Sequence, residues 1–498
     1  MITTLANLAV LAAGAPERAR LLGIRDLAAS QEALLRRILR RDADSEYGRR
    51  HGFAQIRNHA DYRERVPIVT WDDLAGDVER IAMGEQQVLG GERVRLLEPS
   101  SGSTAATKLV PSTRGSQREF QRAIGAWLAD LAVADPRLLT GRSYWSVTPA
   151  AAASSHQAAG PVPIGFEDDA AYAGALRAHL LRRVFAVESG VARSTTMADF
   201  YRRTARGLLA ADDLCLVSVW NPSYLSLLLE QVAELAPSLA DELPASRRPA
   251  ARAAARGDWE AVWPRLRLVS CWADAHAARP AGQLQSLLPQ ARLQPKGLLA
   301  TEGVVSIPVE TADGAVLAAR SHLVEFKQGD RVVLGHELRQ GERYEVLLTT
   351  SAGLHRYRLG DEVEVTGWHG SLPVLRLVGR CDAVSDLVGE KLSEAFVAVC
   401  LRELDVDCFA VLAPEQDHYA LYLGEPRPGL EAGLERLLRR NFHYDHARRL
   451  GQLGPVRAVV AGANADRRLL EARRRAGQRL GDVKTPALAR GSLAFLVE

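Results

Sequence analysis

The chain has 498 residues, a length that exceeds an ordinary single domain and predicts a large core domain with at least one smaller domain. Apolar residues make up 47% and charged residues 25%, and both values are typical of a soluble globular protein. No apolar run approaches the length of a membrane span, so we expect no membrane partner. A net charge of +3 on this length gives no reason to expect a nucleic-acid partner either.

The apolar N-terminus (residues 1–13) lacks a basic n-region and a cleavage site, so we predict a helix there and a cytoplasmic protein. The five cysteines are scattered without metal-ligand spacing, as expected of free thiols in a reducing compartment. Lysine is rare, with five residues against 58 arginines, so each lysine is a hint that a compact ammonium is needed, although chance would explain two or three. The five are Lys108, Lys296, Lys327, Lys391 and Lys484.

In chain order, the first ninety residues predict helices, and 93–97 predict a short strand. Ser116–Glu119 fits a capping box, and the apolar residues behind it recur at helical spacing. The small-residue segment before it is therefore predicted to lie between a strand and a helix. Further on, elements alternate as in an α/β protein. The expected strands are 214–220, 266–272 and 297–300, and the expected helices are 222–229 and one from about 281.

Strand-like runs with Gly and Asp-Gly turns dominate from 304 to 378 and predict a β-rich subdomain. After this region, helix-like and strand-like runs alternate again. We therefore expect an α/β fold with a large N-terminal domain (1–379) that includes the β-rich, barrel-like subdomain, and a small C-terminal α/β cap domain (380–498). Gly379-Arg380-Cys381-Asp382 lies at the change of texture and suits a hinge near 380–382.

The first motif is a turn of small hydroxyl residues followed by a lysine. Hydroxyls and exposed amides on such a turn can grip phosphate oxygens, and the lysine adds a point charge. The glycine-lysine-serine ending of a Walker loop is missing, and an ordinary polar loop has the same composition. The residues are Ser100, Ser101, Gly102, Ser103, Thr104 and Lys108.

Two further motifs carry acidic groups. An apolar strand ends in Thr301-Glu302, where a carboxylate can hold the magnesium ion that accompanies ATP, although a solvated strand terminus would look the same. Tyr357 and Leu359 alternate with arginines and predict a strand whose partner is 362–365, with Gly360-Asp361 at the turn between them. A turn-tip aspartate can accept both hydroxyls of a ribose, or it can simply make a local turn bond.

Together with a late Lys484-Thr485-Pro486, the order and spacing of these motifs resemble the adenylate-forming (ANL) superfamily. Within it, the chain resembles the auxin-responsive Gretchen Hagen family of acyl acid amido synthetases, and specifically its bacterial members. The resemblance runs from roughly residue 60 to the C-terminus, and its most specific piece is the run from Arg356 to Asp361. One departure stands in the first loop, where Ala105 and Ala106 follow the threonine that the family usually follows with glycine.

The resemblance implies that ATP and Mg²⁺ are used to activate a carboxylic acid as an acyl-adenylate, and that an amine, in most cases an amino acid, then displaces AMP. Catalytic roles would fall to Lys484, Thr301 and Glu302, with Glu302 as the metal ligand. It also implies that residues 1–379 form the adenylation domain and that the cap domain rotates about the hinge between the half-reactions. The residues expected to bind the nucleotide are Ser100, Ser101, Gly102, Ser103, Thr104, Lys108, Thr301, Tyr357, Asp361 and Arg380.

Two alternatives stay open at this point. An acyl-CoA-type ligase would transfer the acyl group to a thiol, and a catalytically silent nucleotide-binding relative would transfer nothing. The expected partners are a small carboxylic acid and an amine, and we expect a monomer or a weak homodimer. The identities of the acid and the amine are not encoded in any pattern that the sequence exposes.

Overall fold

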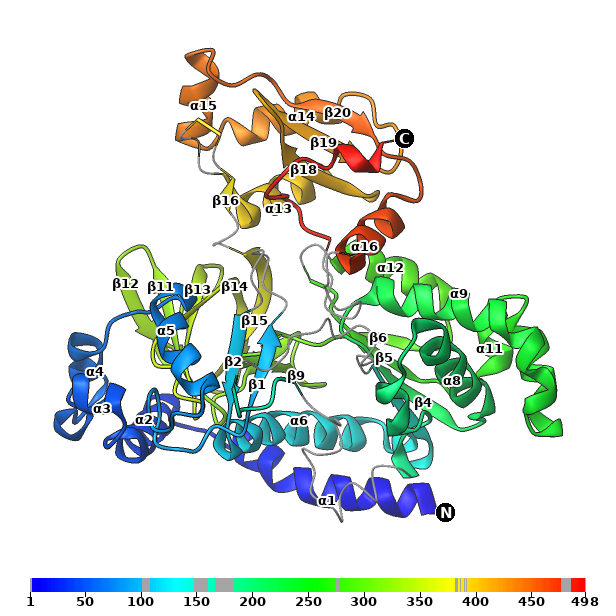
Figure 1. Cartoon of the computed structure of the whole chain (residues 1–498), viewed down its shortest axis with the longest axis horizontal. Coiled ribbons are helices and arrows are strands. Elements are labelled where there is room, and N and C mark those ends of the chain that lie inside the picture. Colours follow the sequence, from blue (N-terminus) through cyan, green and yellow to red (C-terminus); the bar gives the residue numbers. More distant parts are fainter. Residues whose placement is uncertain are drawn as a thin grey trace.

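The computed structural model describes residues 2–100, 108–146, 160–165, 183–274, 277–380, 384–385, 387–388, 390, 392–475 and 485–497. The three largest sheets of the described residues are arranged as Figure 1 shows. A seven-stranded antiparallel sheet lies beside a four-stranded parallel sheet, and a three-stranded sheet lies above both in that view. Helices from the N-terminal region run beneath the two larger sheets.

The N-terminal segment is helical, as predicted. Short polar side chains begin three of its helices, because Asp26, Ser45 and Asn58 each accept a hydrogen bond from a backbone amide of the first turn. The helices are α1 (Ile2–Leu22), α2 (Leu27–Asp42), α3 (Glu46–Arg50), α4 (His59–Arg65) and α5 (Trp71–Ala82).

Helix α6 (Arg114–Ala134) packs along α1 and extends beneath both larger sheets (Figure 1). The two helices meet at a glycine pair, because a Cβ added at Gly14 would lie 2.3 Å from the carbonyl oxygen of Gly125. The helix is capped by Thr113, with Ser116 at the third helical position. The expected start at Ser116 is therefore wrong by one turn.

The segment before α6 differs from the prediction. Strand β1 (Leu96–Ser100) pairs with β2 (Lys108–Ser112) in an antiparallel hairpin, with Ser100 opposite Lys108. The small-residue loop therefore connects two strands, and the placement between a strand and a helix is wrong. Pro111 argues against a strand in the sequence, because proline within a run is found in edge strands and at bulges but not in central strands. The strand β2 is recognised only from its pairing with β1.

The parallel sheet has the order β3-β4-β5-β6, and it contains the predicted buried strands at 214–220 and 266–272. Its fourth strand is β6, whereas 297–300 contributes only β7 (Leu299–Ala300), which pairs with β8 (Gly303–Val304). The expectation that 297–300 belongs to the α/β sheet is thus wrong. The sheet strands are β3 (Arg142–Trp145), β4 (Leu214–Ser218), β5 (Leu268–Cys271) and β6 (Arg292–Pro295).

Both faces of the parallel sheet are covered. Leu214, Val217 and Val269 pack with the helices of this region, whereas Leu216 and Leu268 belong to the cluster that includes the α6 side chains. Asn221 caps α9, as its sequence predicts. The helices of this region are α8 (Met197–Ala210), α9 (Pro222–Leu239), α10 (Arg248–Ala254), α11 (Trp259–Val262) and α12 (Ala278–Leu287).

The predicted β-rich region forms the seven-stranded sheet, in the order β12-β11-β13-β14-β15-β10-β9. Its β14 continues through Gly360-Asp361 instead of turning there, so the predicted turn is wrong. Gly360 adopts a φ of 81°, and a register shift against β13 accommodates the extra residues. The strands are β9 (Ser306–Pro308), β10 (Ala315–Leu317), β11 (Leu323–Gln328), β12 (Arg331–Leu334), β13 (Arg343–Thr349), β14 (Tyr357–His369) and β15 (Leu372–Arg380).

The described residues of the C-terminal region form a short hairpin, the sheet β18-β19-β20 and the helices α13 to α16. Helix α13 packs against β15, where a Cβ added at Gly379 would lie 3.2 Å from the Cα of Ala395. The elements are β16 (Val384–Ser385), β17 (Leu392–Ser393), α13 (Glu394–Glu403), β18 (Ala410–Pro414), β19 (Tyr419–Leu423), α14 (Leu430–Leu438), α15 (Phe442–Arg449), β20 (Arg457–Val460) and α16 (Ala465–Arg475).

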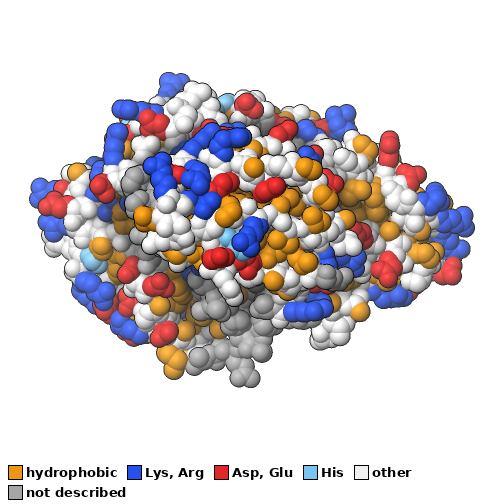
Figure 2. All heavy atoms as spheres, turned by 90° about the horizontal axis from the view of Figure 1, so that it is seen from above, with side chains coloured by type: hydrophobic (Ala, Val, Ile, Leu, Met, Phe, Trp, Pro, Cys, Tyr) orange, Lys and Arg blue, Asp and Glu red, His pale blue; other side chains and the backbone are white. Residues whose placement is uncertain are grey.

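Viewed from above, the molecule shows acidic side chains interspersed among the basic ones around a hydrophobic area (Figure 2). Among the residues that the structure describes, no helix is both long enough and apolar enough to cross a membrane.

Candidate functional site

The first candidate residues lie at the loop end of the β1–β2 hairpin. Ser100 and Lys108 are register partners there, and the Lys108 side chain is half-buried. The loop residues Ser101, Gly102, Ser103 and Thr104, together with Ala105 and Ala106, lie outside the described residues. The hairpin therefore fixes the two ends of the loop.

Thr301 and Glu302 form the two-residue turn between β7 and β8. His322 supports this turn, because the backbone amide of Val304 donates a 3.0 Å hydrogen bond to His322 Nε2. A Cβ added at Gly303 would lie 2.7 Å from the same nitrogen, so this close approach requires glycine. The turn thus has a fixed position relative to the seven-stranded sheet.

Glu302 lies among charged groups from neighbouring strands. The phenol of Tyr357, the first residue of β14, donates a 3.4 Å hydrogen bond to Glu302 Oε1. Burial raises the pKa of Glu302 above its ordinary value, and Asp361 acts in the same direction. Its own backbone amide, Arg380 and Lys108 act in the opposite direction. The structure therefore brings five of the predicted residues into one electrostatic neighbourhood.

Asp361 and Arg380 pair across β14 and β15. They are register partners, and their side chains approach to 3.8 Å between Oδ1 and Nη1. Arg380 Nη2 also donates a 3.2 Å hydrogen bond to the carbonyl of Leu359. Asp361 is only 3% exposed, so its carboxylate is held against the sheet rather than at a solvated turn. The irregular part of β14, where Gly360 has a φ of 81°, directly precedes this side chain.

The two arginines flanking Tyr357 have scaffold contacts. Arg356 Nε donates a 3.0 Å hydrogen bond to Glu325 Oε2, and its Nη1 donates to the carbonyl of Val66. Arg358 forms an ion pair with Glu345 on β13. Of this motif, which gave the sequence resemblance its greatest specificity, Tyr357 and Asp361 face the candidate site and both arginines hold the sheet.

The catalytic candidate Lys484 lies outside the described residues, as do Cys381 and Asp382 of the predicted hinge. The residues that follow Lys484 are well anchored. The carbonyl of Ala487 accepts a hydrogen bond from Leu412 on β18, and its amide donates to Glu394 Oε1 on α13. The chain after Lys484 is thereby fixed to the C-terminal sheet.

One polar network was not predicted. His322 Nδ1 lies 3.2 Å from Glu119 Oε2 on α6, and both side chains are 2% exposed. Glu119 also accepts hydrogen bonds from the amide and the hydroxyl of Ser351, which Arg41 contacts in turn. The network links α2, α6 and the loop after β13 to the Thr301-Glu302 turn. Only long-range contacts create it, so the sequence carried no signal.

A second group was only hinted at, by the scarcity of lysine. Lys296 follows β6, is 6% exposed, and donates a 2.6 Å hydrogen bond from Nζ to Ser218 Oγ at the end of β4. Its ammonium lies 4.9, 5.9 and 5.2 Å from the ring centroids of Trp127, Trp145 and Trp220. This group, named here the tryptophan–lysine cluster, lies at the carboxyl ends of the parallel strands.

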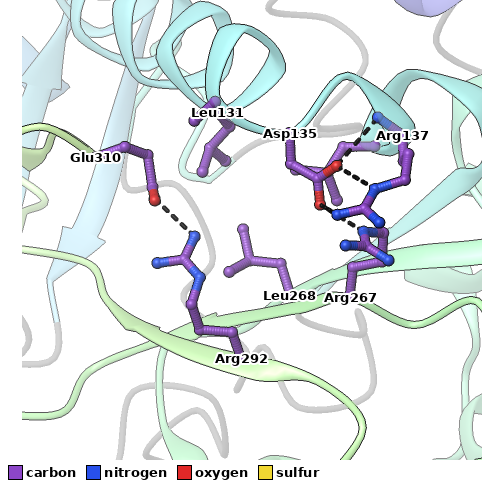
Figure 3. Close-up of a pocket in the computed structure, with 9 residues that line it drawn as sticks. Leu131, Asp135, Arg137, Arg267, Leu268, Arg292 and Glu310 are labelled. Carbon is purple, nitrogen blue, oxygen red and sulfur yellow. Dashed lines mark hydrogen bonds and ion pairs between the residues drawn. The ribbon is translucent and has the colours of Figure 1, made fainter.

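A cavity of about 210 Å³ lies at the opposite edge of the parallel sheet, where β5 and β6 begin (Figure 3). Its charges pair with one another: Arg267 and Arg137 contact Asp135, and Arg292 Nη2 lies 2.7 Å from Glu310 Oε1. Ligands of open α/β sheets bind at the carboxyl ends of the strands, so this cavity is not the candidate site.

The fold and the site define the class of protein, a mixed α/β protein in which the Thr301-Glu302 turn follows the parallel sheet and precedes the seven-stranded sheet in the chain. The structure aligns with a solved acyl acid amido synthetase, AtGH3.15 in complex with 2,4-DB, with a TM-score of 0.81 at 18% identity. The alignment covers 96% of this chain and 94% of that chain. The chain therefore has the fold of that enzyme.

Sequence comparisons agree. The GH3 family N-terminal domain matches residues 24–248, and the GH3 family central domain matches residues 308–380. The chain is 28% identical over 448 residues to the "Probable indole-3-acetic acid-amido synthetase GH3.12" of Oryza sativa subsp. japonica, covering 74% of this chain and 72% of that protein. It is 26% identical over 434 residues to the indole-3-acetic acid-amido synthetase GH3.8 of Oryza sativa subsp. indica, covering 74% and 68%. The chain belongs to the GH3 family, the Gretchen Hagen family that its motifs resemble.

Proposed function

We propose that this protein is an ATP-dependent acyl acid amido synthetase that activates a carboxylic acid as acyl-AMP and transfers the acyl group to an amine, an amino acid in the simplest case. The observation that carries the proposal is the convergence of Glu302, Tyr357, Asp361, Arg380 and Lys108 from four separate elements. Family membership supports it, since the relatives compared above are named as amido synthetases.

In the first half-reaction, a carboxylate oxygen of the acid attacks the α-phosphorus of ATP, and the bond to the pyrophosphate oxygen breaks. Negative charge grows on the phosphoryl oxygens, so fixed cations near them accelerate the step. Lys108 and the hydroxyls of Ser100, Ser101, Ser103 and Thr104 would hold the β- and γ-phosphates, with Gly102 allowing close approach. Thr301 would contact the α-phosphate or the acid, and Lys484 would enter from the C-terminal domain.

Asp361 and Arg380 would bind the ribose. A carboxylate accepts hydrogen bonds from both hydroxyls of a ribose without reorganisation when it is held in place, and the burial of Asp361 beside Arg380 supports this role. Tyr357 would orient Glu302 through their hydrogen bond and line the nucleotide site.

Glu302 is the residue that would hold Mg²⁺. A hard oxygen donor is what this ion requires, and Mg²⁺ is typically held by one or two carboxylates plus substrate phosphates. The raised pKa of Glu302 fits this role, because a cation beside the carboxylate would offset the cost of its burial. When bound, the ion neutralises charge on the phosphates.

In the second half-reaction, the nitrogen of an unprotonated amine attacks the acyl carbon, the bond to the AMP oxygen breaks, and a proton leaves the nitrogen. We propose that residues 380–498 form a cap domain that rotates about a hinge near 380–382 between the two steps. Such a rotation would exclude water from the adenylate and then admit the amine.

The test is ATP–pyrophosphate exchange with a panel of aryl, indolyl and fatty acids. The active acid is then incubated with pooled amino acids and, separately, with coenzyme A, and the products are identified by mass spectrometry. An amide supports the proposal, and a thioester in place of the amide would identify an acyl-CoA-type ligase. Exchange at background with every acid would indicate a nucleotide-binding relative without catalysis.

The cellular setting is part of the proposal. Cys215, Cys271, Cys400 and Cys408 are free thiols, as in a protein of the reducing cytoplasm. We propose a monomer or a weak homodimer, which light scattering across a concentration series would test.

A further inference from the structure

The tryptophan–lysine cluster gathers the last residues of neighbouring strands. Ser218 ends β4, Trp145 ends β3, and Lys296 follows β6 directly. The amide of Lys296 donates a 3.0 Å hydrogen bond to the carbonyl of Cys271, the last residue of β5. All four parallel strands therefore contribute to one place at the carboxyl edge, where open α/β sheets bind their ligands.

The cluster has an aromatic wall that is not sealed from solvent. Trp127 and Trp145 have ring centroids 5.9 Å apart, and so have Trp220 and Trp272. Trp127 is fixed by the 2.9 Å hydrogen bond that its indole N–H donates to Gln294 Oε1. Trp145, Trp220 and Trp272 remain partly exposed. The cluster therefore presents partly exposed aromatic surface beside the buried ammonium.

The ammonium has unused capacity. An ammonium carries three N–H donors, and among the described residues Ser218 Oγ is the acceptor that Lys296 Nζ reaches within hydrogen-bond distance. No carboxylate of the described residues forms an ion pair with it, and the tryptophan faces attract a cation without accepting its hydrogen bonds. Burial lowers the pKa of Lys296 to about 7, and Cys271 opposes this shift. A buried ammonium without a counter-charge is costly to the fold, so a ligand acceptor would stabilise it.

We propose that Lys296, with Trp127, Trp145 and Trp220, is a specificity-determining subsite for acyl acids whose aromatic ring carries an oxygen acceptor at the end away from the reacting carboxylate. A ring hydroxyl and a second carboxylate share this chemistry. The ring stacks against tryptophan, and the distal oxygen accepts a hydrogen bond from the Lys296 ammonium. This inference deepens the proposed function and rests on it for the identity of the reacting group.

The experiment compares acids that differ only in the distal oxygen-bearing group, such as phenylacetate with 4-hydroxyphenylacetate and benzoate with 4-hydroxybenzoate or terephthalate. The kcat/KM for pyrophosphate release is measured for the wild type and for Lys296→Met, which keeps the length of the side chain and removes its charge and donors. Lys327→Met on β11 is the matched control.

The wild type is expected to favour the oxygen-bearing member of at least one pair by about tenfold, the effect of one hydrogen bond to a charged group. Lys296→Met should reduce the ratio to about one, and Lys327→Met should leave it unchanged. A wild type without preference overturns the proposal. So does an equal loss for both members of a pair, because Lys296 would then bind the reacting carboxylate or serve the fold alone.

A binding measurement separates the subsite from the proposed function. The same acids are titrated while tryptophan fluorescence is recorded, because bound rings would perturb the clustered indoles. Tighter binding of the oxygen-bearing acids to the wild type, lost in Lys296→Met, supports the subsite even where no pyrophosphate is released, in which case the proposed function alone fails. Equal binding of both members by both proteins overturns the subsite.

Discussion

Buried charged side chains have different kinds of partner in the regions of the two larger sheets. In the antiparallel region, Arg356 and His59 both contact Glu325, and His355 Nε2 lies 3.4 Å from Asp42 Oδ2. In the parallel region, the buried ammonium of Lys296 meets a hydroxyl and tryptophan rings. In the antiparallel region each of these buried charges has a partner within the protein. In the parallel region the Lys296 ammonium has N–H donors that no acceptor of the described residues uses.

Whether a buried charge has a counter-charge within the protein distinguishes scaffold residues from ligand-binding residues more clearly than the residue type does. Removing one member of a complete buried pair leaves the other charge uncompensated, so such pairs are expected to fix the fold. A buried charge without a counter-charge is costly in the empty protein, and that cost is tolerated where a ligand completes the site. The predictions below test this contrast between the two regions.

The largest effect is expected for Glu325→Gln. Hydrogen bonds from His59 and the charge of Arg356 lower the pKa of Glu325 although burial raises it, so the carboxylate is ionised in the fold. Its loss should lower the free energy of unfolding by about 3–5 kcal/mol, because Arg356 stays buried without its partner. Urea denaturation measures this, with Glu79→Gln on the exposed face of α5 as the control. If Glu325→Gln lost less free energy of unfolding than Lys296→Met at pH 7, the contrast between the two regions would be contradicted.

Asp361→Ala should weaken ATP binding by about 100-fold, because a ribose would lose two hydrogen bonds to a charged acceptor. Calorimetric titration with ATP measures the affinity, and Asp361→Asn and thermal melting separate binding from misfolding. Asp313→Ala, in an exposed turn, is the matched control. Wild-type affinity in a folded Asp361→Ala protein would remove the ribose assignment.

Glu302→Gln should raise the magnesium concentration for half-maximal pyrophosphate exchange by at least about tenfold, since a neutral amide is a weaker ligand for a hard cation. The titration is made at saturating ATP and acid, beside Glu79→Gln. An unaltered magnesium curve would show that the metal ligand lies elsewhere.

The last prediction concerns how stability changes with pH, and its effect is smallest near pH 7. Lys296 has a pKa of about 7 in the fold against an ordinary value near 10.4, so between these values the unfolded chain binds a proton that the folded chain has released. The stability of the wild type should therefore rise with pH relative to Lys296→Met, by up to about 1.4 kcal/mol per pH unit. Urea denaturation at pH 7, 8 and 9 measures the difference. Parallel curves would mean that Lys296 is solvated, and Lys327→Met should follow the wild type.

Local patterns predicted the elements whose causes are local. The helix cap at Asn221 and the buried runs at 214–220 and 266–272 depend on neighbouring residues, and the structure has a helix and two strands there. The β2 strand depends instead on its pairing with β1. The sequence therefore predicted a loop followed directly by a helix at this place. The course of β14 through Asp361 depends on its alignment with β13 and β15.

The candidate site also has a part that local patterns predict and a part that depends on long-range contacts. Thr301, Glu302, Tyr357, Asp361 and Arg380 could be named from motif order, because the chemistry of phosphate and ribose restricts which side chains can serve. Their proximity could not be named, since it results from a hairpin turn, a bulge and a register across three strands. The support that His322 and Glu119 give to the Thr301-Glu302 turn has no sequence pattern at all.

The sequence by itself determined the family, the order of the motifs and the residue types available for adenylation, since these follow from side-chain chemistry and spacing along the chain. Only the tertiary structure decided that Asp361 lies inside a strand beside Arg380, and that a rare lysine stands among three tryptophans at the carboxyl ends of the parallel strands. The physical reason is that burial and charge pairing depend on contacts between distant segments, and a linear pattern does not specify which distant segments meet.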